Sequence, residues 1–353
     1  MRDVLGPLLG WWRAGEPVGM ATVVATWSSA PRGVGAAMVV GPDGRVVGSV
    51  SGGCVEGAVY ELCREVVESG RARTARFGVS DDSAMAVGLP CGGTVELLVE
   101  RVDRERFGEL PRLVEAVDAG RPATLLTRLD DARHLVIDGA ERFGTLGDEG
   151  IDGLAGRLAG GRTRLVEHGS VAVFAASFEP PARMIVFGGT EHAAAVAAMG
   201  AFLGYRVTVC DARGVFATAE RFPAAAEVVV DWPHRYLAGE VAAGRVDART
   251  VLCVLTHDPK FDVPLLEIAL RLPVAYVGAM GSRRTHRDRN RRLAEAGLTD
   301  TELERLASPL GLSLGARTPE ETAVSIAAEI VALRRGGSGA RLTGSDSPIH
   351  PAE

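Results

Sequence analysis

The stretch Met184-Ile185-Val186-Phe187-Gly188-Gly189-Thr190 decides the fold of the second half of this 353-residue chain. Its four apolar residues predict a buried strand, and its glycines turn the chain into an alanine-rich helix over 192–203 that Gly204 ends. A second strand is predicted over 206–210 and closes at Asp211. Strand, helix and strand in this order are typical of neighbouring parallel strands with the helix on one face of the sheet.

The same alternation continues towards the C-terminus. Further strands are predicted at 228–230, 251–255 and 274–277, with helical patterns between them. The last helix begins with a capping box in which Thr318 precedes Pro319 and Glu321, and it runs to Leu333. The second half is therefore predicted to be a Rossmann-like domain with a doubly wound parallel sheet.

The first half has the pattern of a mixed α/β domain. A run rich in β-branched residues at 18–26 predicts a strand, and Pro42-Asp43-Gly44 joins two short strands in a hairpin. A helix is predicted over 56–68, because apolar residues recur at helical spacing and Gly70 follows them. Short strands are predicted at 73–77 and 94–100.

These patterns divide the chain into four segments. Residues 1–105 form the mixed α/β domain, and 106–179 form a less distinctive α/β segment that connects it to the rest. Pro180-Pro181 marks the start of the Rossmann-like domain, which we assign to 180–335. Residues 336–353 are rich in Gly, Ser and Pro and are predicted to be a disordered tail. No internal repeat is visible in the sequence.

Composition limits the classes of function. Hydrophobic residues make up 46% of the chain and charged residues 24%, as in ordinary soluble globular proteins. A net charge of −6 and a pI near 5.8 argue against nucleic acid as a partner. No apolar run reaches membrane-spanning length without a charge, which argues against a membrane partner. Five cysteines without a C-x-x-C pair or a secretory signal predict a cytoplasmic protein with reduced thiols.

Two loops combine a cysteine with glycines: Ser51-Gly52-Gly53-Cys54-Val55-Glu56 and Gly88-Leu89-Pro90-Cys91-Gly92-Gly93. Glycines leave the sulfur accessible and free backbone N–H groups to face an anion, and a soft thiolate suits a soft metal. The predicted helix after Cys54 adds a dipole that favours a thiolate there. The candidate cofactor-binding residues are Ser51, Gly52, Gly53, Cys54, Glu56, Cys91, Gly92 and Gly93, with Cys54 and Cys91 as metal ligands.

The alternative for each loop is a plain turn with an incidental thiol, since free cysteine is often a small core residue. Cys63, Cys210 and Cys253 lie in apolar runs and are predicted to be core. A third segment, 27–35, offers Ser29 and Arg32 to an anion or to the edge of a pterin. Its alternative is a solvated turn.

The loop after the first Rossmann-like strand lies where a dinucleotide fingerprint would fall. Gly188 and Gly189 begin it, and Asp211 stands about 20 residues further on, at the end of the next strand. The fingerprint is incomplete because Thr190 occupies the place of its second glycine, and Glu191 adds a negative charge beside the phosphate site. Gly188, Gly189 and Asp211 remain candidate residues for binding NAD(P).

Two further loops follow the fourth and fifth strands of the predicted sheet, at the carboxyl ends where such sheets bind ligands. The first offers His257 and Asp258, and its alternative is a capping turn. The second offers Gly281, Ser282 and Arg283 to a phosphate. The arginines over 287–292 continue a basic run, for which the alternative is a solvated helix face.

No conventional catalytic set accompanies these loops. The sequence contains no H-E-x-x-H or P-loop lysine motif. We therefore predict no catalytic residues and a binding or maturation protein rather than a turnover enzyme.

At these residues the chain resembles the XdhC/CoxI family, the accessory proteins of xanthine dehydrogenase and related molybdenum hydroxylases. The matching segments are Ser29-Ala30-Pro31-Arg32 and the stretches 48–57, 88–96, 256–258, 278–284 and 315–321. They extend over nearly the whole chain, and the two cysteine loops are the most specific to the family. The chain departs from the family at Thr190, where a glycine is common, and this departure weakens the expectation of nucleotide binding.

The resemblance implies a homodimeric, cytoplasmic chaperone whose cargo is the molybdenum cofactor (molybdopterin). Such a protein protects the cofactor, assists its sulfuration with a cysteine desulfurase as sulfur donor, and inserts it into an apo-molybdenum hydroxylase. Cys54 and Cys91 carry over as the thiols that touch molybdenum or relay sulfur. Two alternatives stay open: an NAD(P)-dependent oxidoreductase built on the Rossmann-like domain, and a thiol-redox sensor that uses Cys54 and Cys91.

Overall fold

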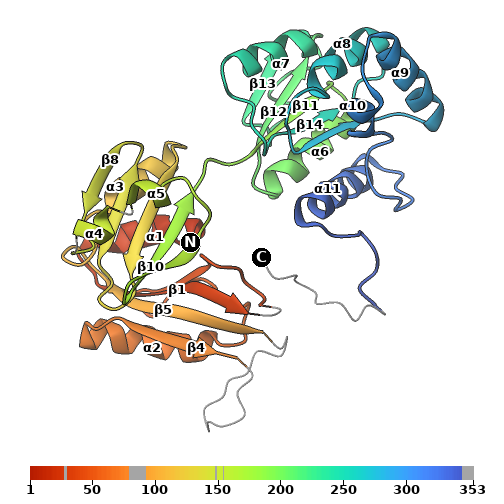
Figure 1. Cartoon of the computed structure of the whole chain (residues 1–353). Coiled ribbons are helices and arrows are strands. Elements are labelled where there is room, and N and C mark those ends of the chain that lie inside the picture. Colours follow the sequence, from red (N-terminus) through yellow and green to blue (C-terminus); the bar gives the residue numbers. More distant parts are fainter. Residues whose placement is uncertain (28–29, 79–92, 148, 154, 344–353) are drawn as a thin grey trace. The chain divides into compact units, whose positions relative to one another are not determined.

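The structure is a computed structural model that describes residues 1–27, 30–78, 93–147, 149–153 and 155–343. It divides into two compact units, Met1–Pro180 and Pro181–Thr343 (Figure 1). The first is mixed α/β and antiparallel, and the second contains a parallel sheet. The predicted fold class, a mixed α/β domain followed by a Rossmann-like domain, is therefore confirmed.

The first half of unit 1 is one five-stranded antiparallel sheet with two helices. Its strands are β1 (Val18–Trp27), β2 (Ala37–Val40), β3 (Val46–Gly48), β4 (Arg73–Phe77) and β5 (Thr94–Val102), in the order β3-β2-β1-β5-β4. Helix α1 (Arg2–Ala14) precedes the first strand, and α2 (Glu56–Ser69) joins the third to the fourth.

The second half of unit 1 repeats this plan. Its strands are β6 (Ala123–Arg128), β7 (His134–Asp138), β8 (Glu141–Gly144), β9 (Arg164–His168) and β10 (Val171–Phe178), in the order β8-β7-β6-β10-β9. Helix α3 (Leu110–Asp118) precedes the first strand, and the short α4 (Glu149–Asp152) and α5 (Ala155–Leu158) join the third to the fourth. Unit 1 is thus two copies of one motif, a repeat that lies in the strand pairing and is not visible in the sequence.

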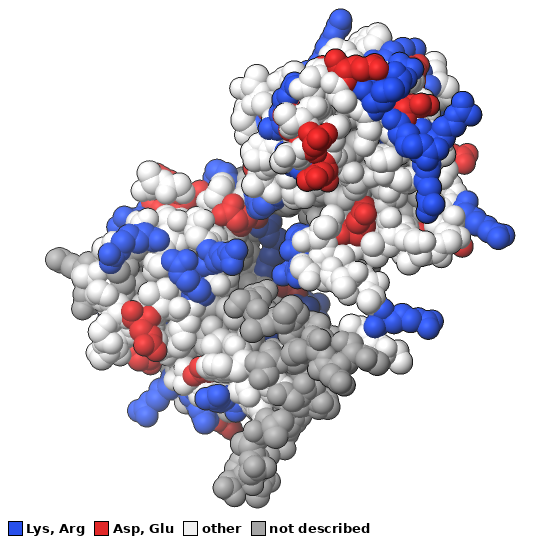
Figure 2. Space-filling model, turned by 45° about the vertical axis from the view of Figure 1, so that its right-hand side comes forward, with Lys and Arg blue, Asp and Glu red and all other residues white. Residues whose placement is uncertain are grey.

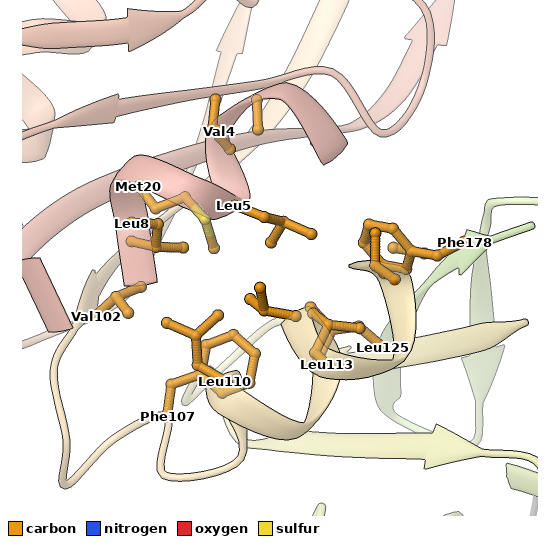
Figure 3. Packing of buried hydrophobic residues seen from close by; sticks show 14 of the residues in the cluster. Val4, Leu5, Leu8, Met20, Val102, Phe107, Leu110, Leu113, Leu125 and Phe178 are labelled. Atoms are coloured by element: carbon orange, nitrogen blue, oxygen red, sulfur yellow. The ribbon is translucent and has the colours of Figure 1, made fainter. Parts of the chain in front are cut away.

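The two copies share one core between their sheets. Leu5 and Leu8 of α1 and Leu110 and Leu113 of α3 lie in it, together with side chains from both sheets such as Met20 (Figure 3). The outer face of the first sheet packs on α2, and that of the second sheet packs on α4 and α5. Unit 1 is therefore layered, with α1 and α3 in its centre.

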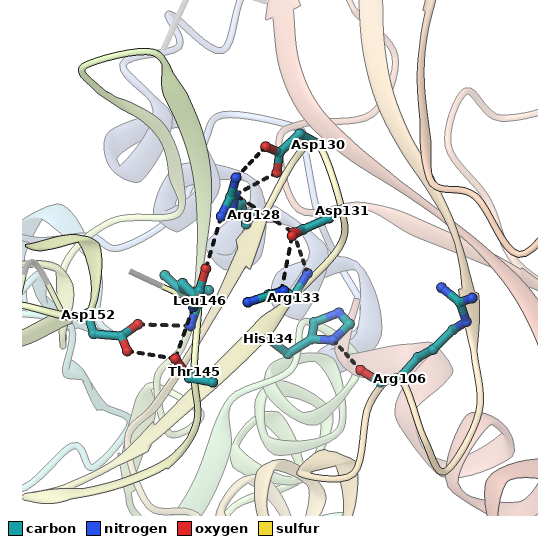
Figure 4. A network of polar contacts seen from close by, with 10 residues as sticks. Arg106, Arg128, Asp130, Asp131, Arg133, His134, Thr145, Leu146 and Asp152 are labelled. Atoms are coloured by element: carbon teal, nitrogen blue, oxygen red, sulfur yellow. Dashed lines mark hydrogen bonds and ion pairs between the residues drawn. The ribbon is translucent and has the colours of Figure 1, made fainter. Parts of the chain in front are cut away.

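A buried ion pair also links the two copies. Nε2 of His134 on β7 lies 2.9 Å from Oε2 of Glu100 on β5, and the His134 ring stacks on Phe107 at 3.9 Å. Its Nδ1 lies 3.2 Å from the carbonyl oxygen of Arg106 (Figure 4). Burial lowers the pKa of His134, but the nearby Glu100 carboxylate and the Arg106 carbonyl outweigh burial and raise it, which favours the protonated ring.

Unit 2 is a six-stranded sheet in which every neighbouring pair is parallel. Its strands are β11 (Arg183–Phe187), β12 (Arg206–Asp211), β13 (Glu227–Val230), β14 (Val251–Val254), β15 (Tyr276–Ala279) and β16 (Leu306–Ala307), in the order β13-β12-β11-β14-β15-β16. The chain runs from β11 to β12 on one side and returns to β14 on the other, so the switch point lies between β11 and β14.

Helices cover both faces of this sheet. Helices α6 (Glu191–Phe202) and α11 (Pro319–Arg335) pack on one face, and α7 (Pro233–Ala242), α8 (Pro259–Ala269) and α9 (Arg283–Glu295) pack on the other. Helix α10 (Asp300–Glu304) precedes β16. The capping box predicted at Thr318 and Glu321 is present at the start of α11. Within the described ranges, no helix is long and apolar enough to cross a membrane.

Candidate functional site

The predicted binding segments of unit 1 leave the first sheet at one end. Trp27 of β1 pairs with Thr94 of β5, and Phe77 of β4 pairs with the neighbouring Val95. At the same end β2 begins and β3 stops, because Met38 pairs with Gly48. The strand pairing therefore places the strand ends that border three segments at the same end of the sheet. These segments are the Cys54 loop, residues 28–36 and residues 78–93. Ser29, Cys91 and Gly92 lie outside the described residues, while Gly93 is buried at the entry to β5.

The Cys54 loop is organised by the carboxylate of Glu56, the first residue of α2. Its Oε1 accepts hydrogen bonds from the Ser49 hydroxyl at 2.7 Å and the Ser51 N–H at 2.9 Å. Its Oε2 accepts from the N–H groups of Gly53 at 2.8 Å and Val55 at 3.2 Å. Partial burial would raise the pKa of Glu56, but the hydroxyls of Ser51 and Ser49 and the backbone donors outweigh it and lower that pKa to about 2.

The expectation that the loop's N–H groups are open to an anion is wrong in this conformation. The Gly52 N–H donates to the Ser49 hydroxyl, the Gly53 N–H to Glu56, and the Cys54 N–H to the Ser51 hydroxyl at 3.0 Å. The physical reason is that Glu56 supplies the negative charge itself. Glycine is still required, because Gly52 has φ 77° and Gly53 has φ 118°.

Cys54 differs from the other described cysteines in its surroundings. Its side chain is half-buried at the margin of the apolar cluster under α2, together with Ala30 and Phe77. The prediction that Cys63, Cys210 and Cys253 are core residues is confirmed, since all three are fully buried and burial raises the pKa of each thiol to about 12. Cys54 is thus the thiol of the described chain that is placed for chemistry.

Two basic side chains flank this end of the first sheet. Arg32 is exposed and lies 3.8 Å from the carboxylate of Asp3, so a ligand there would compete with an ion pair. Trp27 is 41% exposed, and the guanidinium of Arg76 lies 4.3 Å from its ring. Trp27 is thus an exposed aromatic ring at a strand end with one face covered by Arg76, and it was not among the predicted site residues. Its position next to Ser28 and Ser29 was the sequence signal.

In unit 2 the glycines after β11 serve close packing. A side chain at Gly188 would come within 3.0 Å of Leu255, and one at Gly189 within 2.6 Å of Phe216. Thr190, in the place of the missing fingerprint glycine, is the N-cap of α6, and its hydroxyl accepts the Ala193 N–H at 3.1 Å. A glycine has no side chain that could accept this hydrogen bond.

The carboxylate of Asp211 is fully engaged within the protein. It accepts the Gly189 N–H at 2.6 Å and a two-pronged contact from Arg213 at 2.9 and 2.8 Å. Burial would raise the pKa of Asp211, but the Arg213 side chain and the backbone donors lower it. A ribose hydroxyl would have to displace Arg213 to reach this carboxylate.

The other predicted residues of unit 2 start helices. Asp258 caps α8 by accepting the Lys260 N–H, and its neighbour His257 is exposed. Ser282 caps α9 by accepting the Thr285 N–H at 3.1 Å, between Gly281 and the exposed Arg283. The parallel pairing places these helix starts side by side, because they follow the neighbouring strands β14 and β15.

A buried polar network beneath these helix starts escaped the sequence analysis. Asp262 of α8 lies 2.9 Å from Arg289 of α9 and accepts the Thr256 hydroxyl. Arg289 also donates to the Met280 carbonyl at 2.7 Å and to Ser308 at 3.0 Å. The alternative interpretation of the later arginines, a solvated helix face, is therefore wrong at Arg289, which is 3% exposed.

The described residues contain no group of three or more His, Cys, Asp or Glu side chains that could hold a metal ion. A cysteine pair of Cys54 and Cys91 remains a prediction, because Cys91 lies outside the described residues.

Comparison with known proteins agrees with the fold. Residues 184–330 match the family model of the XdhC Rossmann domain, and residues 11–78 match that of the XdhC and CoxI family. The chain is 26% identical over 324 residues to a probable xanthine dehydrogenase subunit of Bacillus subtilis, covering 91% of this chain and 94% of that protein. It is 29% identical over 321 residues to the molybdenum cofactor insertion chaperone PaoD of Escherichia coli, covering 91% and 85%.

A solved structure supports the same assignment over the whole length. The crystal structure of a xanthine dehydrogenase from Bacillus halodurans superposes with a TM-score of 0.74 at 26% identity, and the match covers 98% of each chain. Together the two family models include both the Cys54 loop of unit 1 and the parallel sheet of unit 2. The chain therefore belongs to the XdhC and CoxI family.

Proposed function

We propose that this protein is a chaperone that binds the molybdenum cofactor and inserts it into a molybdenum hydroxylase of the xanthine dehydrogenase type. The observation that carries the proposal is the setting of Cys54, a half-buried thiol in a preorganised loop at the end of a sheet. The PaoD relative is named for insertion of this cofactor, and the Bacillus subtilis relative carries the name of xanthine dehydrogenase.

The site suits a cargo that must be handed over. Molybdenum with sulfur ligands is soft, so contact with a thiolate is favourable. A single described thiol at a loop, without a closed set of ligands, binds reversibly, whereas a full cage would retain the metal. The exposed Trp27 lies at the same end of the sheet and offers a flat surface to a pterin ring.

Further parts of the proposal concern partners. A cysteine desulfurase would supply sulfur while the chaperone holds the cofactor, and an apo-hydroxylase would receive it. We also propose that the protein acts as a homodimer in the cytoplasm, with Cys91 as a second thiol beside Cys54.

The test is the cofactor content of protein purified from a host that makes the cofactor. Molybdenum and pterin should co-purify with the wild type and be lost in a Cys54→Ser, Cys91→Ser double variant. Cys210→Ala is the matched control, because it removes a thiol that is buried in unit 2. Equal cofactor content in the wild type and the double variant would refute the proposal, provided that both unfold at the same temperature.

A Trp27→Ala variant examines the pterin contact separately. It should bind less cofactor while it keeps all five thiols. Thiol alkylation of this variant confirms that the Cys54 loop is intact.

A further inference from the structure

Helix α9 carries more positive charges than the neighbouring carboxylates neutralise. Six of its thirteen residues are arginine. Arg289 pairs with Asp262 and Arg291 with Glu295, while Arg283, Arg284, Arg287 and Arg292 have no ion pair in the described part of the chain. Like charges three or four residues apart destabilise a helix, so this arrangement carries a free-energy cost that an anion would remove.

The distribution of charge on the surface and the pKa of a half-buried histidine both indicate the same excess of positive charge. Figure 2 shows Lys and Arg side chains gathered on one side of unit 2, in a chain whose net charge is −6. Burial lowers the pKa of His286 on the same helix, and the charges of Arg289 and Arg287 lower it further. A positive potential is therefore present along α9.

Part of this charge lines a pocket of about 170 Å³ between the starts of α8 and α9. His257 and Pro259 lie on one side of it, and the α9 residues that line it are Arg284, Thr285, Asp288, Arg289 and Arg292. Two carboxylates also line the pocket, those of Asp262 and Asp288. Asp262 is neutralised by Arg289 at 2.9 Å, so Arg284 and Arg292 face a single uncompensated acid, Asp288.

The floor of the pocket is rigid. Arg289 is tied to Asp262 of α8, to the Met280 carbonyl after β15 and to Ser308 after β16. Thr256, after β14, donates to the same Asp262. These bonds hold α9 in a fixed position relative to the ends of three strands, so the two outer arginines project from a fixed support.

We propose that this pocket binds the phosphoryl group of a small phosphorylated ligand. Guanidinium groups pair with phosphate oxygens in a two-pronged geometry, and two of them with a threonine make a compact phosphate site. The pocket lies at the carboxyl ends of β14 and β15, where sheets of this kind bind ligands. A volume of about 170 Å³ has room for a phosphate or diphosphate group. The proposal stands independently of the cofactor-binding role of unit 1.

The test uses calorimetric titration of the full-length protein with inorganic phosphate and with pyrophosphate, at an ionic strength of about 0.15 M. Pyrophosphate should bind saturably to the wild type. An Arg284→Gln, Arg292→Gln double variant should bind at least about tenfold more weakly, because it loses two charge-assisted contacts. Asp288→Asn should bind more tightly, since it removes the carboxylate that repels the anion.

A matched control separates the pocket from the general charge of the helix. Arg287→Gln, Arg291→Gln removes the same charge from the same helix but leaves the pocket lining intact. It should change pyrophosphate affinity by less than about twofold. Equal losses in the two double variants, or no saturable binding by the wild type, would overturn the proposal. So would tighter binding of a short RNA that both double variants weaken equally. Circular dichroism of each variant checks that α9 is still folded.

Discussion

The loop between β3 and α2 and the loop between β8 and α4 occupy the same place in the two copies that build unit 1. In the first, the Glu56 carboxylate accepts the Ser49 hydroxyl, seven residues before it, and the Val50 N–H. In the second, the Asp152 carboxylate accepts the Thr145 hydroxyl, also seven residues before it, and the Leu146 N–H (Figure 4). Both loops are therefore capped in the same way, each by a carboxylate of its own copy.

The strand ends before these loops are also alike. Gly48 has φ 81° and Gly144 has φ 89°. A side chain on either would collide with a carbonyl oxygen of the neighbouring strand, that of Ala37 at 2.2 Å or that of His134 at 2.5 Å. What the copies share is therefore a scaffold for a strand-to-helix loop.

What the copies do not share is chemistry. Only the first loop contains Gly52-Gly53-Cys54, and only the first copy joins its last two strands through the long segment 78–93 that contains Cys91. In the second copy Gly169-Ser170 makes the same connection. The difference teaches that Glu56 belongs to the scaffold, while the cysteines are additions to it. We therefore treat Glu56 as a residue that positions Cys54 rather than as a ligand of the cofactor.

The largest expected effect is in thiol reactivity. With a limiting alkylating reagent at pH 8, Cys54 should react at least about a hundredfold faster than Cys63, whose thiol is buried with a pKa raised to about 12. Cys210 and Cys253 should be as slow as Cys63. Peptide mapping by mass spectrometry measures the four rates. Labelling of Cys63 at the rate of Cys54 would show that the core under α2 becomes exposed easily. Cys54 would then not differ in reactivity from a cysteine of the scaffold.

The same experiment ranks the two loop cysteines. We expect Cys54 to react faster than Cys91, because α2 begins two residues after Cys54 whereas Cys91 precedes β5. The reverse order would make Cys91 the better candidate for contact with molybdenum.

The second prediction compares the two caps directly. Glu56→Ala should lower the free energy of unfolding by about 2–3 kcal/mol, because several loop donors lose a charged acceptor. Asp152→Ala should lower it by about 1–2 kcal/mol, since fewer donors of the described loop, Thr145 and Leu146, reach the Asp152 carboxylate. Urea unfolding measures both. A larger loss for Asp152→Ala would reverse the assignment of the stronger cap to the first copy.

The third prediction uses two glycines only a few residues apart. Gly53→Ala should cost about 1–2 kcal/mol, because φ 118° is unfavourable for a residue with a side chain. Gly57→Ala should stabilise the protein by about 0.5–1 kcal/mol, because Gly57 lies in α2 with no described atom near the added methyl group. Thermal unfolding of the two variants should thus shift in opposite directions. A loss at both positions would mean that space, not backbone conformation, limits this loop.

The sequence predicts most of the parallel sheet, because β11, β13, β14 and β15 are apolar runs that are each followed by a turn and a helix. It also predicts the buried cysteines, whose neighbours are apolar. It does not predict the role of Glu56, because the sequence pattern of a carboxylate beside glycines is the same whether the carboxylate binds a ligand or the backbone of its own loop. Nor does it predict the burial of Arg289, whose partner Asp262 is 27 residues away in the chain.

The repeat in unit 1 escapes the sequence for a related reason. Ala21 pairs with Met38 and Val99 in the first sheet, as Leu126 pairs with Leu135 and Ala175 in the second. These residues share burial and register but not identity. Hydrogen-bond pairing conserves a pattern of apolar positions, and many side chains satisfy such a pattern.

The smallest expected effect is the pH dependence of the first cap. The folded-state pKa of Glu56 is about 2, below the ordinary value of 4.5. A depressed carboxylate stabilises the folded state above its unfolded pKa, and this contribution is lost as the pH falls from about 4.5 towards 2. Because the carboxylate is partly solvated, we expect the loss to be about 1 kcal/mol over this range.

The matched comparison is Glu56→Gln, which cannot titrate but keeps the shape of the side chain. The stability gap between the wild type and this variant should be widest above pH 5 and should narrow as the pH falls to 3, as measured by urea unfolding at each pH. Any other acid that titrates in this range changes both proteins equally and cancels in the difference. A gap that stays constant with pH would mean that Glu56 acts through its shape and not through its charge. The negative charge of the carboxylate, which is the feature that the two copies have in common, would then not contribute to the stability of the loop.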